Sequence, residues 1–306
     1  MVVTNYPYWP RILKQIGKLL TVLFLLSIVS VLIDRKQHLL RYITFPDIAV
    51  SILGAALSIL LAFRTNSAYA RWWEARTLWG AMVNSSRSLA RQAISFPRRS
   101  GSQVLQDASL AFSDSFVRRQ IAFVQATRCT LRRQQLTEDI RPFLDAETLQ
   151  CVTGCQNVPA ALLQEMGKQL TTAVDQHVLN DWHMNRIDST LSDLSNVLGA
   201  CERIKNTPLP VQYDYYPELL IKVYCIILPF VIVDEVGIFT PVITLIIGFA
   251  FLVLNRIGKN LENPFENLPY DVPMTALSRT IEINLRQALG DKNLPPPVTP
   301  VDGVLM

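Results

Sequence analysis

The sequence has few of the side chains from which metal and catalytic sites are built. It contains three histidines, and its five cysteines form no Cys-x-x-Cys pair. The nearest two, Cys151 and Cys155, have no neighbouring histidine, which argues against a metal site and against a disulfide framework. The sequence also lacks a His-Glu-x-x-His motif and a glycine-rich phosphate loop. We therefore expect no bound metal, no cofactor and no enzymatic activity.

An excess of one charge is also lacking. Lysine and arginine number 29 against 25 aspartates and glutamates, a formal charge of only +4. This balance implies no nucleic-acid partner, because such proteins carry a basic surface. Half of the residues are hydrophobic, and the mean hydropathy of +0.23 is high for a soluble protein. The composition therefore favours a membrane protein.

Four apolar runs, each bounded by charged residues, predict four transmembrane helices. They cover residues 19–33, 48–63, 219–233 and 236–254. Each reaches or falls short of the roughly 20 residues that cross a bilayer as a helix. One such run could be a buried core helix, but four in so apolar a chain favour membrane spans. The first run has no small-residue cleavage site, so we expect a retained helix rather than a signal peptide.

Basic residues near the ends of the runs predict the orientation in the membrane. They precede the first run and follow the second and the fourth: Arg11, Lys14, Lys18, Arg64, Arg71, Arg76, Arg256 and Lys259. The basic loop between the first two runs argues the other way, but it is outnumbered. We expect a multi-pass protein of the plasma (inner) membrane with both termini in the cytosol.

The rest of the chain has helical spacing of its apolar residues without long apolar runs, so the predicted fold class is all-α. Residues 64–91 contain no proline, and the second membrane helix is expected to continue into the cytosol. The predicted organisation has four parts. Residues 1–63 form the first two transmembrane helices, 64–215 a cytosolic helical bundle, 216–258 the third and fourth transmembrane helices, and 259–306 a cytosolic segment with a proline-rich tail.

Three motifs, in chain order, resemble the prokaryotic branch of the bestrophin family. They are Arg71, Trp72 and Trp73 after the second run, residues 201–210 before the third, and Asn263, Pro264 and Phe265 after the fourth. The resemblance covers most of the chain. It implies a homopentameric ion channel whose four transmembrane helices continue into a cytosolic helical bundle around a central pore. The partners expected from it are monovalent ions, the lipid bilayer and further copies of the chain.

The resemblance also implies where the pore is narrow. The family has a neck of three apolar residues, spaced by four, upstream of the Arg-Trp-Trp triplet, and the matching positions are Ala55, Ile59 and Phe63. Family members usually have a larger side chain at the position of Ala55, so the outermost constriction is expected to be wider. Without the resemblance, the same spacing would equally suit packing against lipid or neighbouring helices.

A second constriction is expected on the cytosolic side, within residues 179–187. Its candidates are Leu179, Asp181, His183, Met184 and Ile187. At the outer mouth the candidate is Asp47, whose carboxylate could concentrate cations or could simply favour the helix N-terminus.

The neck is uncharged, so the charged mouths must select the sign of the ion. The carboxylates of Asp47, Asp181 and Asp188 favour monovalent cations such as Na⁺. The alternatives are an anion (chloride) channel of the same architecture, as in animal bestrophins, and a non-conducting membrane scaffold or sensor. Only Glu266 and Asp271 follow the Asn-Pro-Phe motif, too few for the six to eight oxygen ligands of calcium, so calcium gating is not expected.

Overall fold

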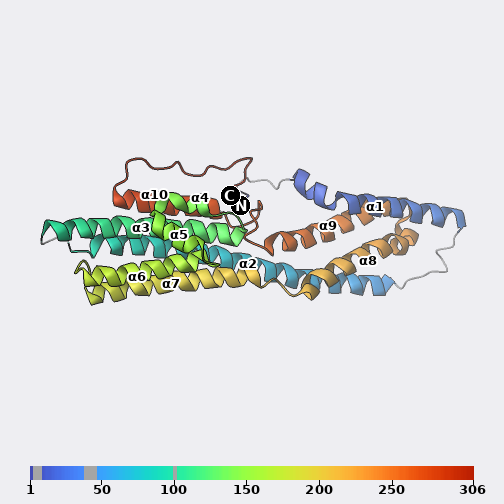
Figure 1. The fold of residues 1–306 in the computed structure, drawn as a ribbon. Coiled ribbons are helices and arrows are strands. Elements are labelled where there is room, and N and C mark those ends of the chain that lie inside the picture. The colour runs from blue at the N-terminus through green and yellow to red at the C-terminus, as the bar shows by residue number, and fades with distance from the viewer. Residues whose placement is uncertain (3–8, 38–46, 99–101) are drawn as a thin grey trace. The chain divides into compact units, whose positions relative to one another are not determined.

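The structure is a computed structural model that describes residues 1–2, 9–37, 47–98 and 102–306. Helices dominate these residues (Figure 1), and the only β-pairing among them consists of isolated bridges near the two ends of the chain. The helices are α1 (Trp9–Gln37), α2 (Asp47–Ser95), α3 (Gln103–Arg132), α4 (Thr137–Ile140), α5 (Ala146–Thr153), α6 (Val158–Asp175), α7 (Asp181–Asn206), α8 (Val211–Val236), α9 (Thr240–Leu261) and α10 (Met274–Leu289). The predicted all-α fold class is confirmed.

The chain divides into two compact units. The first, which we call the membrane unit, comprises Thr4–Trp72 and Pro208–Asn263 and contains α1, the first part of α2, α8 and α9. The second, the bundle unit, comprises Met1–Val3, Trp73–Thr207 and Pro264–Met306. Helix α2 is common to both and runs without interruption for 49 residues, as the absence of proline predicted.

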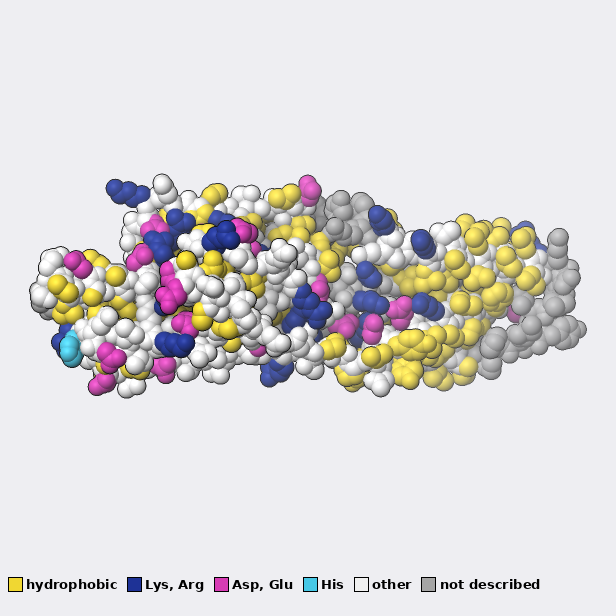
Figure 2. Space-filling model, viewed as in Figure 1, with side chains coloured by type: hydrophobic (Ala, Val, Ile, Leu, Met, Phe, Trp, Pro, Cys, Tyr) yellow, Lys and Arg dark blue, Asp and Glu magenta, His cyan; other side chains and the backbone are white. Residues whose placement is uncertain are grey.

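The membrane unit contains the long apolar helices. Three continuous helical stretches are long and apolar enough to cross a bilayer: Ile12–Arg35, Ile48–Ser95 and Val211–Leu261. The last is α8 and α9 joined by a short 3₁₀ turn, so the stretches contain four helices, one for each predicted run. Gly237 allows the turn because its φ of +56° lies in a region that other residues rarely adopt. Hydrophobic side chains cover most of the surface of this unit that Figure 2 shows.

Small residues bring the helices of the membrane unit into close contact. A Cβ atom on Gly248 of α9 would lie 2.9 Å from the Leu23 side chain of α1, and one on Gly258 would lie 3.3 Å from Thr65 Oγ1 of α2. Close approach at small residues is typical of helix packing in membranes, where lipid tails remove the hydrophobic drive between helices. Around these contacts lies a core of apolar side chains that includes Leu23, Leu57, Leu61, Ile221, Cys225 and Leu228.

The bundle unit is built around α3. All residues from 120 to 129 of this helix are buried, so its middle is enclosed on every side, and it packs against α6, α7 and α10. Polar side chains begin the surrounding helices in the usual way: Ser102, Asp145, Asn157 and Asn180 each accept a backbone N–H at the first turn of α3, α5, α6 and α7. The core contains Trp79, Phe116, Phe123, Leu194 and Phe265.

A buried carboxylate lies in the segment that connects α9 to α10. Asp271 is 2% exposed, and its Oδ2 accepts the backbone N–H of Leu268 at 3.0 Å. Among the described residues its Oδ1 has no hydrogen-bond partner. Burial raises the pKa of Asp271 to about 6, although the hydrogen bond from Leu268 works in the opposite direction.

This carboxylate should make stability depend on pH. Its pKa in the folded protein, about 6, exceeds the value of about 3.9 for an unfolded chain. The folded state therefore holds the proton more tightly, and the stability gained at low pH is lost as the pH rises through about 6. We expect Asp271→Asn to gain thermal stability over the wild type between about pH 5 and about pH 7.5. Thermal unfolding at both pH values measures this, with Asp302→Asn in the exposed tail as control. An equal pH response of wild type and Asp271→Asn would contradict it.

Candidate functional site

In the membrane unit, α2 leaves one face open. Its exposed residues lie on one broad side of the helix, mostly in adjacent pairs such as Ala55 with Ala56 and Ala62 with Phe63. We call five of them, at helical spacing along this side, the open row: Ile48, Ile52, Ala55, Ile59 and Phe63. The exposed fractions of Ile59 and Phe63 are 59% and 64%, whereas Leu57 and Leu61 on the other side are buried. The three predicted neck residues therefore share one open, uncharged face.

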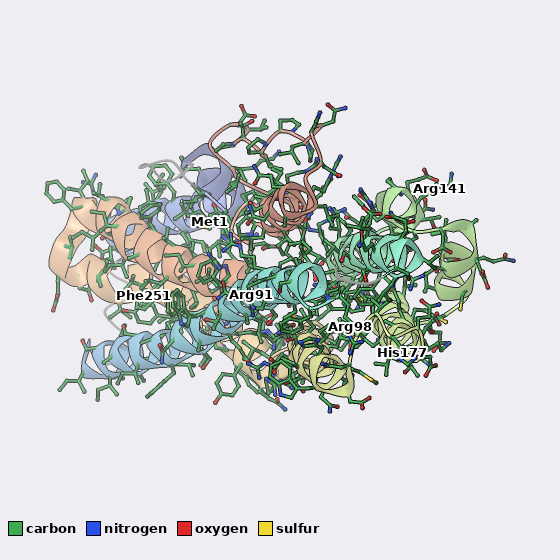
Figure 3. All side chains as sticks on the ribbon, turned by 90° about the vertical axis from the view of Figure 1, so that its left-hand side faces the viewer. Met1, Arg91, Arg98, Arg141, His177 and Phe251 are labelled. Carbon is green, nitrogen blue, oxygen red and sulfur yellow. The ribbon has the colours of Figure 1, made fainter. Side chains whose placement is uncertain are left out.

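In the bundle unit, the exposed side of α2 becomes polar. Asn66 and Ala70, still in the membrane unit, continue the helical spacing. The exposed residues of α2 that follow are Trp73, Glu74, Thr77, Asn84, Arg87, Arg91 and Ser95, and we call Trp73, Thr77, Asn84, Arg87 and Arg91 the polar row. Glu74 pairs with Arg203 at 2.6 Å. Arg87 is held by an amide rather than a carboxylate, because its Nε and Nη2 donate to Asn284 Oδ1 at 2.9 and 2.7 Å. Arg91 lies one helical turn further on α2 (Figure 3). The polar row ends with two arginines whose positive charge remains available to ions.

The predicted cytosolic constriction lies at the start of α7. Leu179 and Ile187 are buried in the core of the bundle unit, Asp181 is exposed, and His183 and Met184 are half-buried. A side chain enclosed within one chain cannot line a path between chains. The candidates that the structure leaves accessible are therefore the ones within residues 181–184.

Sequence reasoning did not single out Trp182, which lies in the same segment. Its side chain is 67% exposed, beside a His183 ring that stacks on Phe96 with 4.6 Å between ring centroids. The sequence does contain a signal for it. Asn180 and Asp181 are typical of a helix start, and Trp182 is a large aromatic residue in the first turn that follows. Asn180 Oδ1 accepts the N–H of His183 at 2.8 Å and so fixes where this turn starts.

Opposite the open row, α2 carries a buried cation. Arg64 is 1% exposed, and its guanidinium donates to Asn255 of α9 and to Asp214 of α8. A second carboxylate, Glu262, lies 3.7 Å away. A buried charge is tolerated only when it is paired and hydrogen-bonded, so these partners are what allow Arg64 to sit inside the apolar unit.

Two lysines extend this group of charges, which we call the Arg64 network. Lys259 Nζ lies 3.5 Å from Asp214 Oδ2 and 3.0 Å from Glu218 Oε2, and Lys222 Nζ lies 2.8 Å from Glu218 Oε1. With Arg64 and Glu262, the network has three positive and three negative groups. Because each charge has an opposite neighbour, the network joins α2, α8 and α9 without a net charge.

The first motif triplet contacts the residue that directly precedes the second. Arg71 Nε donates to the backbone carbonyl of Glu262 at 2.9 Å, directly before Asn263. Trp72 stacks with Tyr69, whose ring centroid lies 6.2 Å away. Asn263 is exposed, whereas Pro264 and Phe265, which open the next segment of the bundle unit, are buried. These contacts are consistent with the structural role expected of both motifs.

The outer-mouth candidate stands at the first residue of α2. Helix α2 begins at Asp47, but the Asp47 side chain lies outside the described residues, as do His38 and Arg41 in the preceding loop.

The helical stretch from α1 to α10 matches known proteins. Residues 9–287 fit the family model described as Bacterial/Fungal Bestrophin protein. The chain is 35% identical over 304 residues to the Voltage-dependent anion channel-forming protein YneE of Salmonella typhi, covering 96% of both chains. It is 34% identical over 309 residues to the protein of the same name from Escherichia coli strain K12, covering 98% of both. A crystal structure of a bacterial bestrophin homolog from Klebsiella pneumoniae is similar with a TM-score of 0.82 and 28% identity, over 90% of this chain and 98% of that chain.

Removing the charge of Arg64 should destabilise the membrane unit. Arg64→Leu removes the nearest cation from Asp214 and from Glu262, and leaves Asp214 with Lys259 at 3.5 Å. Breaking a fully buried pair costs about 3–5 kcal/mol, and the loss should be smaller here because the Asp214 side chain is 36% exposed. We expect a clear fall in the thermal unfolding midpoint of the detergent-solubilised protein. Adding Asp214→Asn should restore part of the loss. The control is Arg141→Leu, which removes an exposed ion pair with Glu138 at the edge of the bundle unit (Figure 3). Equal midpoints for Arg64→Leu and the control would contradict the anchoring role.

Proposed function

The chain belongs to the bacterial and fungal bestrophin family, a family of ion channels, and from this premise we propose that it is one subunit of a pore lined by the open row of α2. The observation that carries the proposal is the exposure of Ala55, Ile59 and Phe63 on one face, opposite the buried Arg64. One helix face cannot enclose water. Several copies arranged around an axis would turn this face into a narrow apolar passage.

We propose five copies, as the resemblance implies. The uncharged neck would hold ions only when it is wide enough to admit water with them, so its width would control conduction. The membrane unit would cross the plasma membrane as part of a multi-pass protein with both termini in the cytosol. A non-conducting scaffold remains the rival proposal, but it gives no reason for an exposed, uncharged row on a helix whose other side is anchored by charges.

The ion sign expected from the sequence needs correction. The relatives described above are named as anion channel-forming proteins, which does not support the preference for cations inferred from Asp47, Asp181 and Asp188. We propose the alternative, an anion channel. Arg87 and Arg91 in the polar row support it, because their repetition around an axis would concentrate anions in the cytosolic part of the path, well beyond the neck.

A second narrow point is proposed at residues 181–184. Trp182 is the large, open side chain of this segment, and Asp181, His183 and Met184 flank it. Five indole rings would narrow the cytosolic exit by size. The exposed carboxylate of Asp181 would repel anions there. In this proposal the arginines of the polar row therefore select the sign of the ion.

The neck proposal predicts a larger current when its bulk is removed. In Ile59→Ala, Phe63→Ala the apolar atoms that would narrow the axis are lost, and we expect a larger single-channel conductance in planar bilayers. Leu25→Ala is the matched control, because Leu25 is exposed on α1 and loses comparable bulk away from the open row. Each variant is first shown by mass measurement to assemble like the wild type. Unchanged conductance in a correctly assembled double variant would mean that these side chains do not face the ions.

The anion proposal is tested by the reversal potential under a KCl gradient. We expect it to shift towards the chloride equilibrium potential, most strongly at low salt, where exposed charges are least screened. Neutralising the polar row in Arg87→Gln, Arg91→Gln should move it back towards zero. Arg141→Gln, which changes the net charge away from α2, should leave it unchanged. A wild-type reversal near the potassium equilibrium potential would overturn the anion proposal and restore the cation alternative.

A further inference from the structure

A small cavity lies between α1, α8 and α9 in the membrane unit. Its volume is about 120 Å³. Its lining is divided between apolar and charged or polar side chains: Ile16, Leu19, Ile221 and Leu252 on one hand, and Gln15, Glu218, Lys222, Asn255, Arg256 and Lys259 on the other. Such a mixed lining suits a ligand that has a charged group attached to an apolar body.

Positive charge prevails in the cavity. Its lining contains three cations but one carboxylate, Glu218, which contacts Lys222 and Lys259 at 2.8 and 3.0 Å. Arg256 is held by an amide instead: its Nε donates to Gln15 Oε1 at 2.6 Å. Asp214, outside the lining, lies 3.5 Å from Lys259 and offsets part of that charge. The guanidinium of Arg256 therefore retains donors and a full charge for an anion.

The surroundings of the cavity point to the bilayer. Arg256 and Lys259 lie in the last turns of the apolar stretch that ends at Leu261, the level at which lipid headgroups meet a membrane helix. Figure 2 shows charged side chains gathered at one end of the apolar surface of this unit. Within one or two turns of the lining residues, α1 exposes Leu13, and α8 exposes Leu220 and Val223. Acyl chains could lie along these side chains.

We propose that this cavity binds the phosphate group of an anionic phospholipid. Arg256 would contact the phosphate oxygens, Lys222 and Lys259 would add positive charge, and the lipid tails would follow the exposed apolar side chains of α1 and α8. Basic cavities between membrane helices are a known setting for anionic headgroups. The proposal depends on the proposed function only in placing the cavity at the cytosolic leaflet, and binding does not require that the channel conducts.

The charges in the cavity predict opposite effects for two substitutions. Arg256→Gln removes a cation from the proposed contact and should weaken binding of phosphatidylglycerol about fivefold, the contribution of one basic residue at a membrane surface. Glu218→Gln removes the competing carboxylate and releases Lys222 and Lys259, so it should tighten binding. A purely structural role of these residues would not produce changes of opposite sign. Lys18→Gln is the matched control, because Lys18 is exposed on α1 and does not line the cavity.

The experiment uses the full-length protein in phosphatidylcholine nanodiscs, with bound phosphatidylglycerol counted by native mass spectrometry as its fraction is raised. The expected order of affinity is Glu218→Gln, then wild type and Lys18→Gln together, then Arg256→Gln. Equal binding of phosphatidylglycerol and phosphatidylcholine, or no effect of Arg256→Gln, would overturn the proposal. Displacement of the lipid by an equal concentration of inorganic phosphate would instead assign the site to the free ion and overturn the lipid assignment. Conductance of the same preparations is recorded separately, so failure of the channel proposal would be seen independently.

Discussion

The membrane unit depends on one buried guanidinium. Arg64 has to be paired because an isolated charge in an apolar interior is too costly, and its partners come from the first turn of α8 and the end of α9. Gly258 lets α9 approach α2 beside Thr65, next to Arg64 in the chain. The side of α2 that carries Arg64 therefore packs against helices α8 and α9 of the same chain. The opposite side, with Ile59 and Phe63, is left exposed, and it is the side proposed to face other copies and ions.

This division would allow the proposed neck, which is uncharged, to belong to a selective channel. Ile59 and Phe63 offer no group that distinguishes a cation from an anion, so discrimination has to arise elsewhere along the path. The polar row of α2 places Arg87 and Arg91 after the neck, on a helix that continues without a break. A single long helix can therefore carry both the proposed narrow point and, several turns further along, charges that would enrich one kind of ion in the same path.

The Arg64 network and the proposed lipid site share three residues, Glu218, Lys222 and Lys259. Lys259 contacts both Asp214, a partner of Arg64, and Glu218, which lies in the cavity lining. A phosphate that attracts Lys259 would therefore compete with the carboxylates that help to anchor α2. Through this shared cation, binding of a lipid phosphate would affect how firmly α2, the helix proposed to line the pore, is anchored.

The sequence by itself determined the all-α class, the four apolar helices, the uninterrupted α2 and the shared face of the neck residues, because each depends on local periodicity or on a short motif. Tertiary structure alone decided which side chains pair, which are buried and where a helix continues through proline. It pairs Arg64 with residues 150 and 191 positions away, it buries Leu179 and Ile187, and it keeps α8 helical through Pro217 and Pro229. No local pattern encodes these outcomes, since each depends on a side chain from a distant helix or on burial among several helices. The preference for cations, which the names of the relatives do not support, rested on carboxylates counted along the chain, and that count does not reveal which charges lie on the open side of α2.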